Sequence, residues 1–194
     1  MRRLIVNEFL SVDGVMQGPG SPDEDRDGGF QHGGWQTEYF DEGVLAGARE
    51  GMGNADAYLF GRRTYQIMAA HWPTAPDDDP FAGHLNATKK YVASRTLTKL
   101  DWQNSELLQG DASEAVARLK EQPGNDIVVL GSGELVQTLM AHGLVDEFGL
   151  IVSPLLLGSG KRLFRDAEQV RRLKLVRCTS TPKGNLLVSY QPAA

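Results

Sequence analysis

The sequence has very little cysteine, and this scarcity excludes several classes of protein. Cys178 is the single cysteine in 194 residues, so the chain can form neither an internal disulfide nor a metal site made of several thiolates. A zinc deaminase signature, which needs two cysteines, is excluded for the same reason. Because Cys178 lies in a strand-like run, we expect it to be buried and unreactive. The histidines lack metal-ligand spacing and the acidic run at 77–79 is typical of a solvated loop, so we expect no metal site.

Long apolar segments and blocks of basic residues are missing too. No run approaches membrane-spanning length, and the N-terminal segment turns polar too soon for a signal peptide. With a net charge of −5 and no Lys/Arg cluster, the chain gives no reason to expect a nucleic-acid partner. We expect one cytoplasmic domain over residues 1–194, without membrane or nucleic-acid partners, that acts on a small molecule.

The most informative stretch runs from Asp126 to Phe164. A short β-branched run, 127–130, is typical of a buried strand. The glycine turn at 131–133 follows, Glu134 begins a helical pattern, and a second strand is expected at 145–152. Strand, glycine turn and helix N-terminus together favour an anion, because the unpaired N–H groups and the helix dipole point at it.

The remaining pattern predicts an α/β fold. One long segment, 17–34, is rich in Gly, Pro and Asp and shows no element, so it is either a functional lid or a disordered strap. Alternating strands and helices indicate a mostly parallel sheet, and the C-terminal hairpin adds antiparallel strands. We expect further strands at 3–10, 55–60, 90–93 and 105–108, helices at 36–52, 62–70 and 112–122, and the hairpin at 173–179 and 185–190.

Three of the expected strands end in sequences that suit an anion: 61–64, 94–96 and 131–133. In open α/β sheets, ligands bind beyond the carboxyl ends of the strands. Arginines at two of these ends suit phosphate, because the planar guanidinium donates two parallel hydrogen bonds. The three ends together predict a ligand with several phosphates, such as NADP.

With these motifs the chain resembles the dihydrofolate-reductase-like superfamily, and specifically the pyrimidine reductase domain of bacterial riboflavin biosynthesis. The resemblance covers nearly the whole chain. Gly33-Gly34-Trp35 also resembles stand-alone reductase-like members of the superfamily. The motifs are SVDG at 11–14, GRRTY at 61–65, SR at 94–95, GSGEL at 131–135, VDE at 145–147 and PLLLG at 154–158.

The resemblance implies a dihydrofolate-reductase-like fold, hydride transfer from NADPH and a homodimer. Ser94 and Arg95 would meet the adenosine 2′-phosphate and select NADPH over NADH, while the turns around Arg62 and Gly131 would hold the pyrophosphate. The implied cofactor residues are Gly61, Arg62, Arg63, Thr64, Ser94, Arg95, Gly131, Ser132, Gly133, Glu134 and Leu135.

On the substrate side, the resemblance places Asp13 near the nicotinamide, where a carboxylate would polarise or protonate the acceptor. Asp13 is equally consistent with a plain turn residue, since Asp-Gly is a common turn pair. Trp35 either closes over the ligand or anchors its loop in the core. Glu147 is either an exposed edge carboxylate or a substrate contact, and Leu155 is expected to line the substrate pocket.

The leading hypothesis is an NADPH-dependent reductase of a small heterocyclic or carbonyl acceptor, nearest to the phosphoribosylamino-pyrimidine reductase of riboflavin synthesis. Those reductases commonly have a glutamate where this chain has Leu130, which leaves the acceptor open. A nucleotide-binding protein without turnover is the alternative. A Rossmann dehydrogenase is disfavoured, because Val136 replaces the third glycine of its fingerprint. A phosphate loop at 158–161 is disfavoured, because Arg162 replaces its Ser/Thr.

Overall fold

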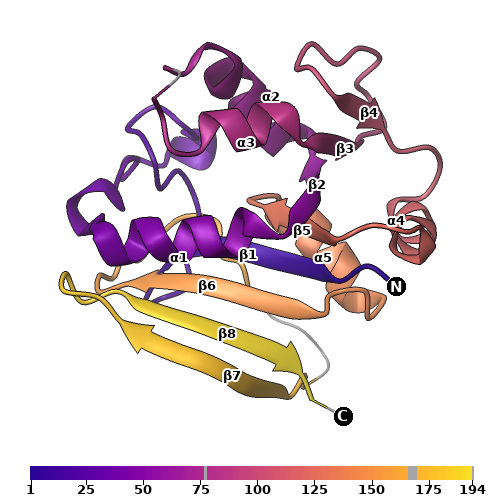
Figure 1. Ribbon diagram of the computed structural model, residues 1–194. Helices are drawn as coiled ribbons and strands as arrows, with labels where there is room; N and C mark the ends of the chain where they lie inside the picture. Colours follow the sequence, from indigo (N-terminus) through magenta and orange to yellow (C-terminus); the bar gives the residue numbers. More distant parts are fainter. Residues whose placement is uncertain (77, 166–169, 194) are drawn as a thin grey trace. The chain divides into compact units, whose positions relative to one another are not determined.

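The computed structural model describes residues 1–76, 78–165 and 170–193. Its strands follow the order β4-β3-β2-β5-β1-β6-β8-β7 in an eight-stranded sheet (Figure 1). Strand β3 pairs in parallel with β4 and with β2, and β2 also pairs in parallel with β5; β8 pairs antiparallel with both β6 and β7. The predicted fold class, a mostly parallel α/β sheet with a C-terminal antiparallel hairpin, is confirmed. The chain divides into two compact units, Met1–Ile5 with Met52–Leu144, and Val6–Gly51 with Val145–Ala194.

The first unit alternates parallel strands with helices. Its strands and helices are β2 (Ala55–Gly61), α2 (Arg62–His71), the 3₁₀ helix η3 (Trp72–Thr74), α3 (Ala82–Ala87), β3 (Lys89–Ala93), β4 (Ser105–Leu107), α4 (Ala112–Glu121), β5 (Asp126–Leu130) and α5 (Gly133–Ala141). The predicted strands and the helices α2, α4 and α5 are confirmed within a few residues. Helix α3 was not predicted, because six residues are too few to show a helical period.

Stacked aromatic residues lie in the core of the first unit, among aliphatic side chains. Tyr58 and Phe60 stack on β2, and Trp102 stacks on Phe60 with a ring-centroid distance of 6.0 Å. Lys90 is fully buried beside Trp102, and its ammonium donates to backbone carbonyls at the end of α3, including Leu85 O at 2.7 Å. A buried charge is tolerated when its donors are satisfied in this way.

The second unit contains β1 (Leu4–Ser11, whose first residues belong to the other unit), the 3₁₀ helices η1 (Asp27–Gly29) and η2 (Thr37–Tyr39), α1 (Glu42–Gly53), β6 (Glu147–Ser153), β7 (Leu173–Ser180) and β8 (Leu186–Pro192). The helix predicted from residue 36 begins at 42. Asp41 stops it from starting earlier, because its carboxylate accepts the Val44 N–H at 2.9 Å as an N-cap. A Cβ at Gly47 would meet Leu187 Cδ2 of β8, so that side chain would have to shift to admit one.

The hairpin of β7 and β8 forms as predicted, with antiparallel pairing from Leu173↔Pro192 to Ser180↔Leu186 (Figure 1). All eight residues of β7 are exposed. The expectation that Cys178 is buried is therefore wrong. The cause is that β7 is the terminal strand of the sheet order, and a strand pattern alone does not indicate which strand lies at the edge.

Candidate functional site

The three anion-favouring strand ends lie at one edge of the first unit's sheet. Strand β2 pairs in parallel with both β3 and β5, in registers that include Gly61↔Ala93 and Leu59↔Val129. Because the strands are parallel, their carboxyl ends emerge together. The segments that follow them, 61–64, 94–96 and 131–133, are thus brought to the same edge, as the sequence predicted.

Helices α2 and α5 begin at this edge without a side-chain cap. Their N-caps, Gly61 and Ser132, accept no helical N–H through a side chain among the described residues. Helix α4 differs, because the Asp111 carboxylate accepts Ser113 N at 2.8 Å and Glu114 N at 3.3 Å. The first-turn N–H groups of α2 and α5 are therefore the ones that can receive an anion, while a carboxylate already occupies α4.

The turn before α5 has a conformation that its glycine makes possible. Gly131 has φ +60°, and a Cβ there would lie 2.8 Å from Thr64 Cγ2. Ser132 is also left-handed, with φ 62° and ψ 39°, which costs energy for a residue with a side chain. The turn is consequently pressed against the start of α2, and Gly133 begins α5 directly after it.

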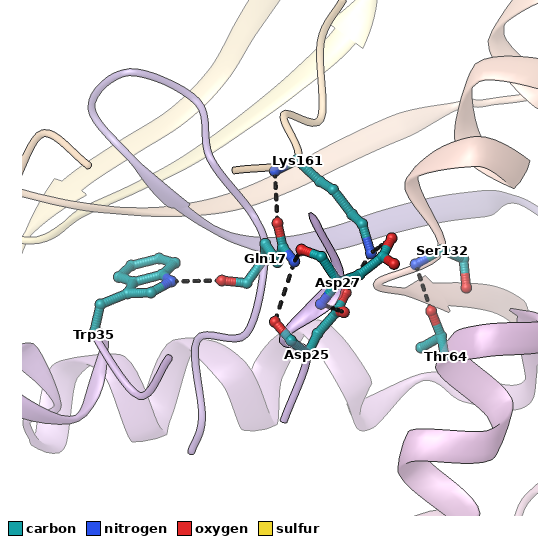
Figure 2. A network of polar contacts seen from close by, with 7 residues as sticks. All are labelled: Gln17, Asp25, Asp27, Trp35, Thr64, Ser132 and Lys161. Atoms are coloured by element: carbon teal, nitrogen blue, oxygen red, sulfur yellow. Dashed lines mark hydrogen bonds and ion pairs between the residues drawn. The ribbon is translucent and has the colours of Figure 1, made fainter. Parts of the chain in front are cut away.

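Hydrogen bonds join the two turns. Gly61 N donates to Ser132 Oγ at 2.9 Å, and Ser132 N donates to Thr64 Oγ1 at 2.9 Å. Figure 2 shows Ser132 and Thr64 facing each other. The loops after β2 and β5 therefore form one connected surface in the first unit.

The charged residues predicted at this edge are exposed. Arg62, Arg63 and Arg95 are accessible, and Arg62 Nη1 donates to Gln66 Oε1 at 3.3 Å. Ser94 Oγ accepts from Leu97 N at 3.0 Å and so shapes the turn that carries Arg95. Three exposed guanidinium groups at one sheet edge supply the positive charge that a phosphorylated ligand requires.

Two further predicted cofactor residues belong to the first turn of α5. Glu134 is exposed there. Leu135 is only 7% exposed, so its side chain belongs to the interior and its backbone N–H alone is available to a ligand. Leu130, at the end of β5, packs against the unit's hydrophobic core.

In the second unit, Asp13 lies among hydrogen-bond donors. Its carboxylate accepts the Ser11 hydroxyl at 2.7 Å, Leu157 N at 3.1 Å and Gly158 N at 2.9 Å. Arg162 Nη2 lies 3.3 Å from the same group. The Ser11 hydroxyl and the other donors hold the pKa of the Asp13 carboxyl far below the usual Asp range, although partial burial acts in the opposite direction. The hydrogen bond from the Ser11 hydroxyl has the largest effect, and the backbone N–H groups add to it. Asp13 is therefore ionised at neutral pH.

Trp35 anchors the long loop in the interior of the second unit. It is 8% exposed, its Nε1–H donates to Gln17 O at 2.9 Å, and its ring belongs to a cluster with Val15 and Phe30. Leu155 packs against the same cluster. Of the two roles considered for Trp35, this structure favours the anchor.

The segment 17–34, in which the sequence pattern indicates no element, contains a short 3₁₀ helix and several hydrogen bonds of its own. The helix is η1, and Gln17 Nε2 donates to Asp25 O at 3.1 Å and to Asp27 O at 2.9 Å. Lys161, which follows the segment in the chain, forms ion pairs with it: its Nζ lies 2.6 Å from Asp25 Oδ2 and 3.0 Å from Asp27 Oδ2 (Figure 2). Side-chain to backbone bonds of this kind leave no periodic trace in a sequence, which is why the sequence pattern does not indicate η1 or these contacts.

The other residues that the sequence singled out contact neighbouring strands or loops. Glu147 on β6 is half-buried and accepts Gln191 Nε2 of β8 at 3.0 Å. The sequence pattern does not indicate the ion pair of Arg162 with Asp13, because the two residues are 149 positions apart in the chain. Asp77 lies outside the described residues.

Within the described residues, no group of three or more His, Cys, Asp or Glu side chains could hold a metal ion. None of the described helices has both the length and the apolar character that a membrane span needs.

The fold and this edge define the class of protein: an α/β domain whose parallel strands end at uncapped helix N-termini and exposed arginines. The chain belongs to the family of the RibD C-terminal domain, whose family model matches residues 2–187. The resemblance inferred from the motifs is confirmed at the level of the family.

Known relatives agree with this placement. YyaP of Bacillus subtilis, a protein of uncharacterized function, is 30% identical over 196 residues, which cover 97% of this chain and 94% of YyaP. A Shewanella structure provisionally described as a riboflavin biosynthesis protein superposes with a TM-score of 0.71 and 19% identity, covering 99% of both chains.

A bifunctional enzyme also has this fold. The diaminohydroxyphosphoribosylaminopyrimidine deaminase/5-amino-6-(5-phosphoribosylamino)uracil reductase of Thermotoga maritima superposes with a TM-score of 0.65 and 13% identity over 99% of this chain and 57% of that one. At such low identity these structures establish the shared fold only.

Proposed function

We propose that this protein is an NADPH-dependent reductase that transfers hydride to a small heterocyclic or carbonyl acceptor. The observation that carries the proposal is the edge of the first unit, where two uncapped helix N-termini and exposed arginines follow adjacent parallel strands. Pyrophosphate fits the N–H groups of α2 and α5, and Arg95 is the residue we assign to the 2′-phosphate. NADPH would supply the hydride at the acceptor.

The acceptor that family membership suggests is a phosphoribosylamino-pyrimidine of riboflavin synthesis. We assign Asp13 the role of polarising the acceptor and not that of a proton donor, because its donors keep it ionised. Leu130 stands where a glutamate is common in pyrimidine reductases, so pterin and carbonyl acceptors belong in the same screen. We propose that the substrate of this chain is a small molecule.

A second candidate is a protein of this fold that binds NADP without turnover. It is favoured by the saturated surroundings of Asp13, whose carboxylate already accepts several hydrogen bonds. The two candidates differ in one measurable property, which is NADPH oxidation in the presence of an acceptor. Asp13→Asn would abolish that oxidation in the reductase and leave NADPH binding unchanged in both.

The first test is a titration of the protein with NADPH and with NADH, followed by nicotinamide fluorescence. We expect a clear preference for NADPH, and about tenfold weaker NADPH binding in Arg95→Ala, since a charge-assisted contact to phosphate is lost. NADH affinity should stay unchanged in that variant. The matched control is Arg118→Ala on α4, whose side chain is 61% exposed. Absence of binding by either cofactor would reject the proposal.

We also propose that the protein forms a homodimer through β7. The family resemblance implies a dimer, and β7 is the terminal strand with every residue exposed. Large aliphatic side chains gather on it, with Leu175 52% exposed and Val176 51% exposed. Such a surface is unusual on an isolated soluble chain.

A further inference from the structure

The long segment of the second unit forms a loop whose two ends are joined. Gly34 N donates to Gly18 O at 2.8 Å. A loop that is closed at its base in this way is an Ω-loop, which packs through its own contacts. We call residues 19–33 the Ω-loop. Because the base is fixed, the part that can still dock on the rest of the unit or leave it is the middle, residues 25–30.

Two side chains outside the Ω-loop hold its middle part. Gln17 Nε2 donates to Asp25 O at 3.1 Å and to Asp27 O at 2.9 Å, which fixes the backbone. Lys161 Nζ lies 2.6 Å from Asp25 Oδ2 and 3.0 Å from Asp27 Oδ2, so that one ammonium serves two carboxylates (Figure 2). We call the ion pairs of Lys161 with these two aspartates the clasp.

The clasp matters because one of its carboxylates is largely buried. The Asp25 side chain is only 14% exposed. A carboxylate removed from water to this degree is costly unless a cation and hydrogen-bond donors accompany it. Asp27 N donates to Asp25 Oδ1 at 3.1 Å, and Lys161 supplies positive charge. A neutral residue at position 161 would therefore favour the return of Asp25 to water and the release of the Ω-loop.

Lys161 also belongs to a short backbone ladder. Residues 161–163 run antiparallel to residues 14–17, and we call these two segments the ladder. Its hydrogen bonds run from Met16 N to Lys161 O at 2.8 Å, from Leu163 N to Gly14 O at 3.1 Å and from Lys161 N to Gln17 Oε1 at 3.0 Å. The ladder joins the residue that forms the clasp to the turn that follows β1.

Asp13 lies directly before the ladder in that turn. Its carboxylate accepts Leu157 N at 3.1 Å and Gly158 N at 2.9 Å. These two residues precede Lys161 in one loop, so Asp13 holds one end of that loop and the clasp holds the other. Contiguous hydrogen bonds of this kind can carry a displacement from one end to the other.

We propose that Lys161 is a positioning residue: its ion pairs dock the Ω-loop, and the ladder passes the docked position on to Asp13. In the docked state the N–H groups of Leu157 and Gly158 stay on the Asp13 carboxylate. When the clasp opens, these hydrogen bonds weaken together with the contacts of the Ω-loop. The effect on turnover rests on the proposed function, in which Asp13 polarises the acceptor, whereas the coupling itself does not.

Amide hydrogen exchange on the protein without ligand tests the coupling. Lys161→Met removes the charge and keeps the length of the side chain, and Lys161→Arg keeps the charge. In Lys161→Met we expect the amides of Gly29 in the Ω-loop and Gly158 beside Asp13 to exchange about tenfold faster. The amide of Leu150 on β6 should not change, because the opening is local. Lys161→Arg should resemble the wild type.

A second variant separates charge from shape. In Lys161→Met/Asp25→Asn the buried carboxylate is removed together with its cation, so slow exchange should return. The matched control is Arg26→Met, because Arg26 pairs with Asp23 in the same loop through side chains that are 69% and 77% exposed. It should leave exchange unchanged.

Salt tests the clasp in the wild-type protein, so the test does not depend on any variant that folds poorly. The Lys161 side chain is 33% exposed, and about 1 M NaCl should speed exchange of the Gly29 and Gly158 amides together. Unchanged exchange both in salt and in Lys161→Met would overturn the clasp. Faster exchange of Gly29 with no change of Gly158 would overturn the coupling to Asp13.

Turnover is measured separately. If the wild type oxidises NADPH with an acceptor, Lys161→Met should lower kcat about tenfold and leave the KM for NADPH unchanged, with recovery in Lys161→Arg. An unchanged kcat in a variant that shows faster Gly158 exchange would overturn the positioning role. If the wild type oxidises no NADPH, the reductase proposal falls, while the exchange of Gly29 and Gly158 still decides the coupling.

Discussion

The carboxylate of Asp13 accepts hydrogen bonds from the Ser11 hydroxyl and from the N–H groups of Leu157 and Gly158, and Arg162 lies beside it. These groups favour the ionised form, because each of them stabilises negative charge. A carboxylate whose pKa lies far below neutrality holds no proton to donate at pH 7. Asp13 can therefore act only electrostatically on a ligand. Its hydrogen bonds also tie the turn after β1 to the loop after β6.

Asp13→Asn should reduce stability in a pH-dependent way. The folded-state pKa of Asp13 is depressed, so its stabilising contribution is fully present above the unfolded value, near 3.9. It is lost as the pH falls through the folded-state pKa. We expect the variant to lose about 1–2 kcal/mol of unfolding free energy at pH 7, with the difference shrinking as the pH falls below about 4. Urea unfolding at a series of pH values measures this.

A control for that experiment is Asp23→Asn, because the Asp23 side chain is 77% exposed. Its effect should be close to zero over the whole range, as for most exposed ion pairs. A pH-independent loss in Asp13→Asn would contradict the assignment, since it would indicate that shape and not charge holds the turn.

Several site residues could be predicted from the sequence, and others could not. Arg62, Arg95 and Gly131 follow buried apolar runs directly, so local pattern placed them at strand ends. The pairing of Asp13 with Arg162 and of Gln17 with Lys161 joins residues far apart in the chain. Such pairs depend on how loops fold back on each other, which no local period encodes. The assignment of these residues to a cofactor stays a prediction.

Among the elements, the turn between β5 and α5 carries the tightest backbone constraint at the candidate site. Gly131→Ala would place a Cβ 2.8 Å from Thr64 Cγ2 at a φ of +60°. The left-handed conformation and the clash add, so we expect a loss of roughly 2 kcal/mol or more of unfolding free energy. NADPH binding should weaken as well, because the start of α5 would have to move away from α2. Thermal unfolding and the fluorescence titration measure the two effects.

Gly143 provides the matched control for this substitution. It follows the other end of α5 with a similar φ of +65°, and a Cβ there meets nothing within 4 Å. Gly143→Ala should cost about 1 kcal/mol for the conformation alone and leave NADPH binding unchanged. Equal effects of the two substitutions would show that contact with Thr64 is unimportant.

The strands were the easiest elements to predict, because buried parallel strands read as short, continuous apolar runs. Helix α1 was placed too early, because Tyr39 and Phe40 fit its apolar spacing although Asp41 caps the helix after them. The exposure of Cys178 could not be foreseen for a different reason. Burial of a strand depends on its neighbours in the sheet, and the position of β7 at the end of the order is a property of the topology.

At the scale of the whole chain, membership of the RibD C-terminal domain family establishes the fold but not the acceptor. The family match spans residues 2–187, yet the relative YyaP is itself uncharacterized, and the Shewanella and Thermotoga structures share only 19% and 13% identity with this chain. Function therefore has to be argued from sites, since one fold hosts many reactions.

The exposed strand β7 bears on how the whole molecule assembles, because we propose it as the dimer interface. A dimer with two-fold symmetry would bring the same surface of both copies together, so one substitution alters the interface twice. We expect wild-type protein to show about twice the monomer mass of 21.2 kDa in light scattering, and Val176→Glu to shift it to monomer by burying unpaired charge. Val170→Glu, at a residue 88% exposed but outside β7, should stay dimeric. A monomeric wild type, or a dimer unaffected by Val176→Glu, would reject β7 as the interface.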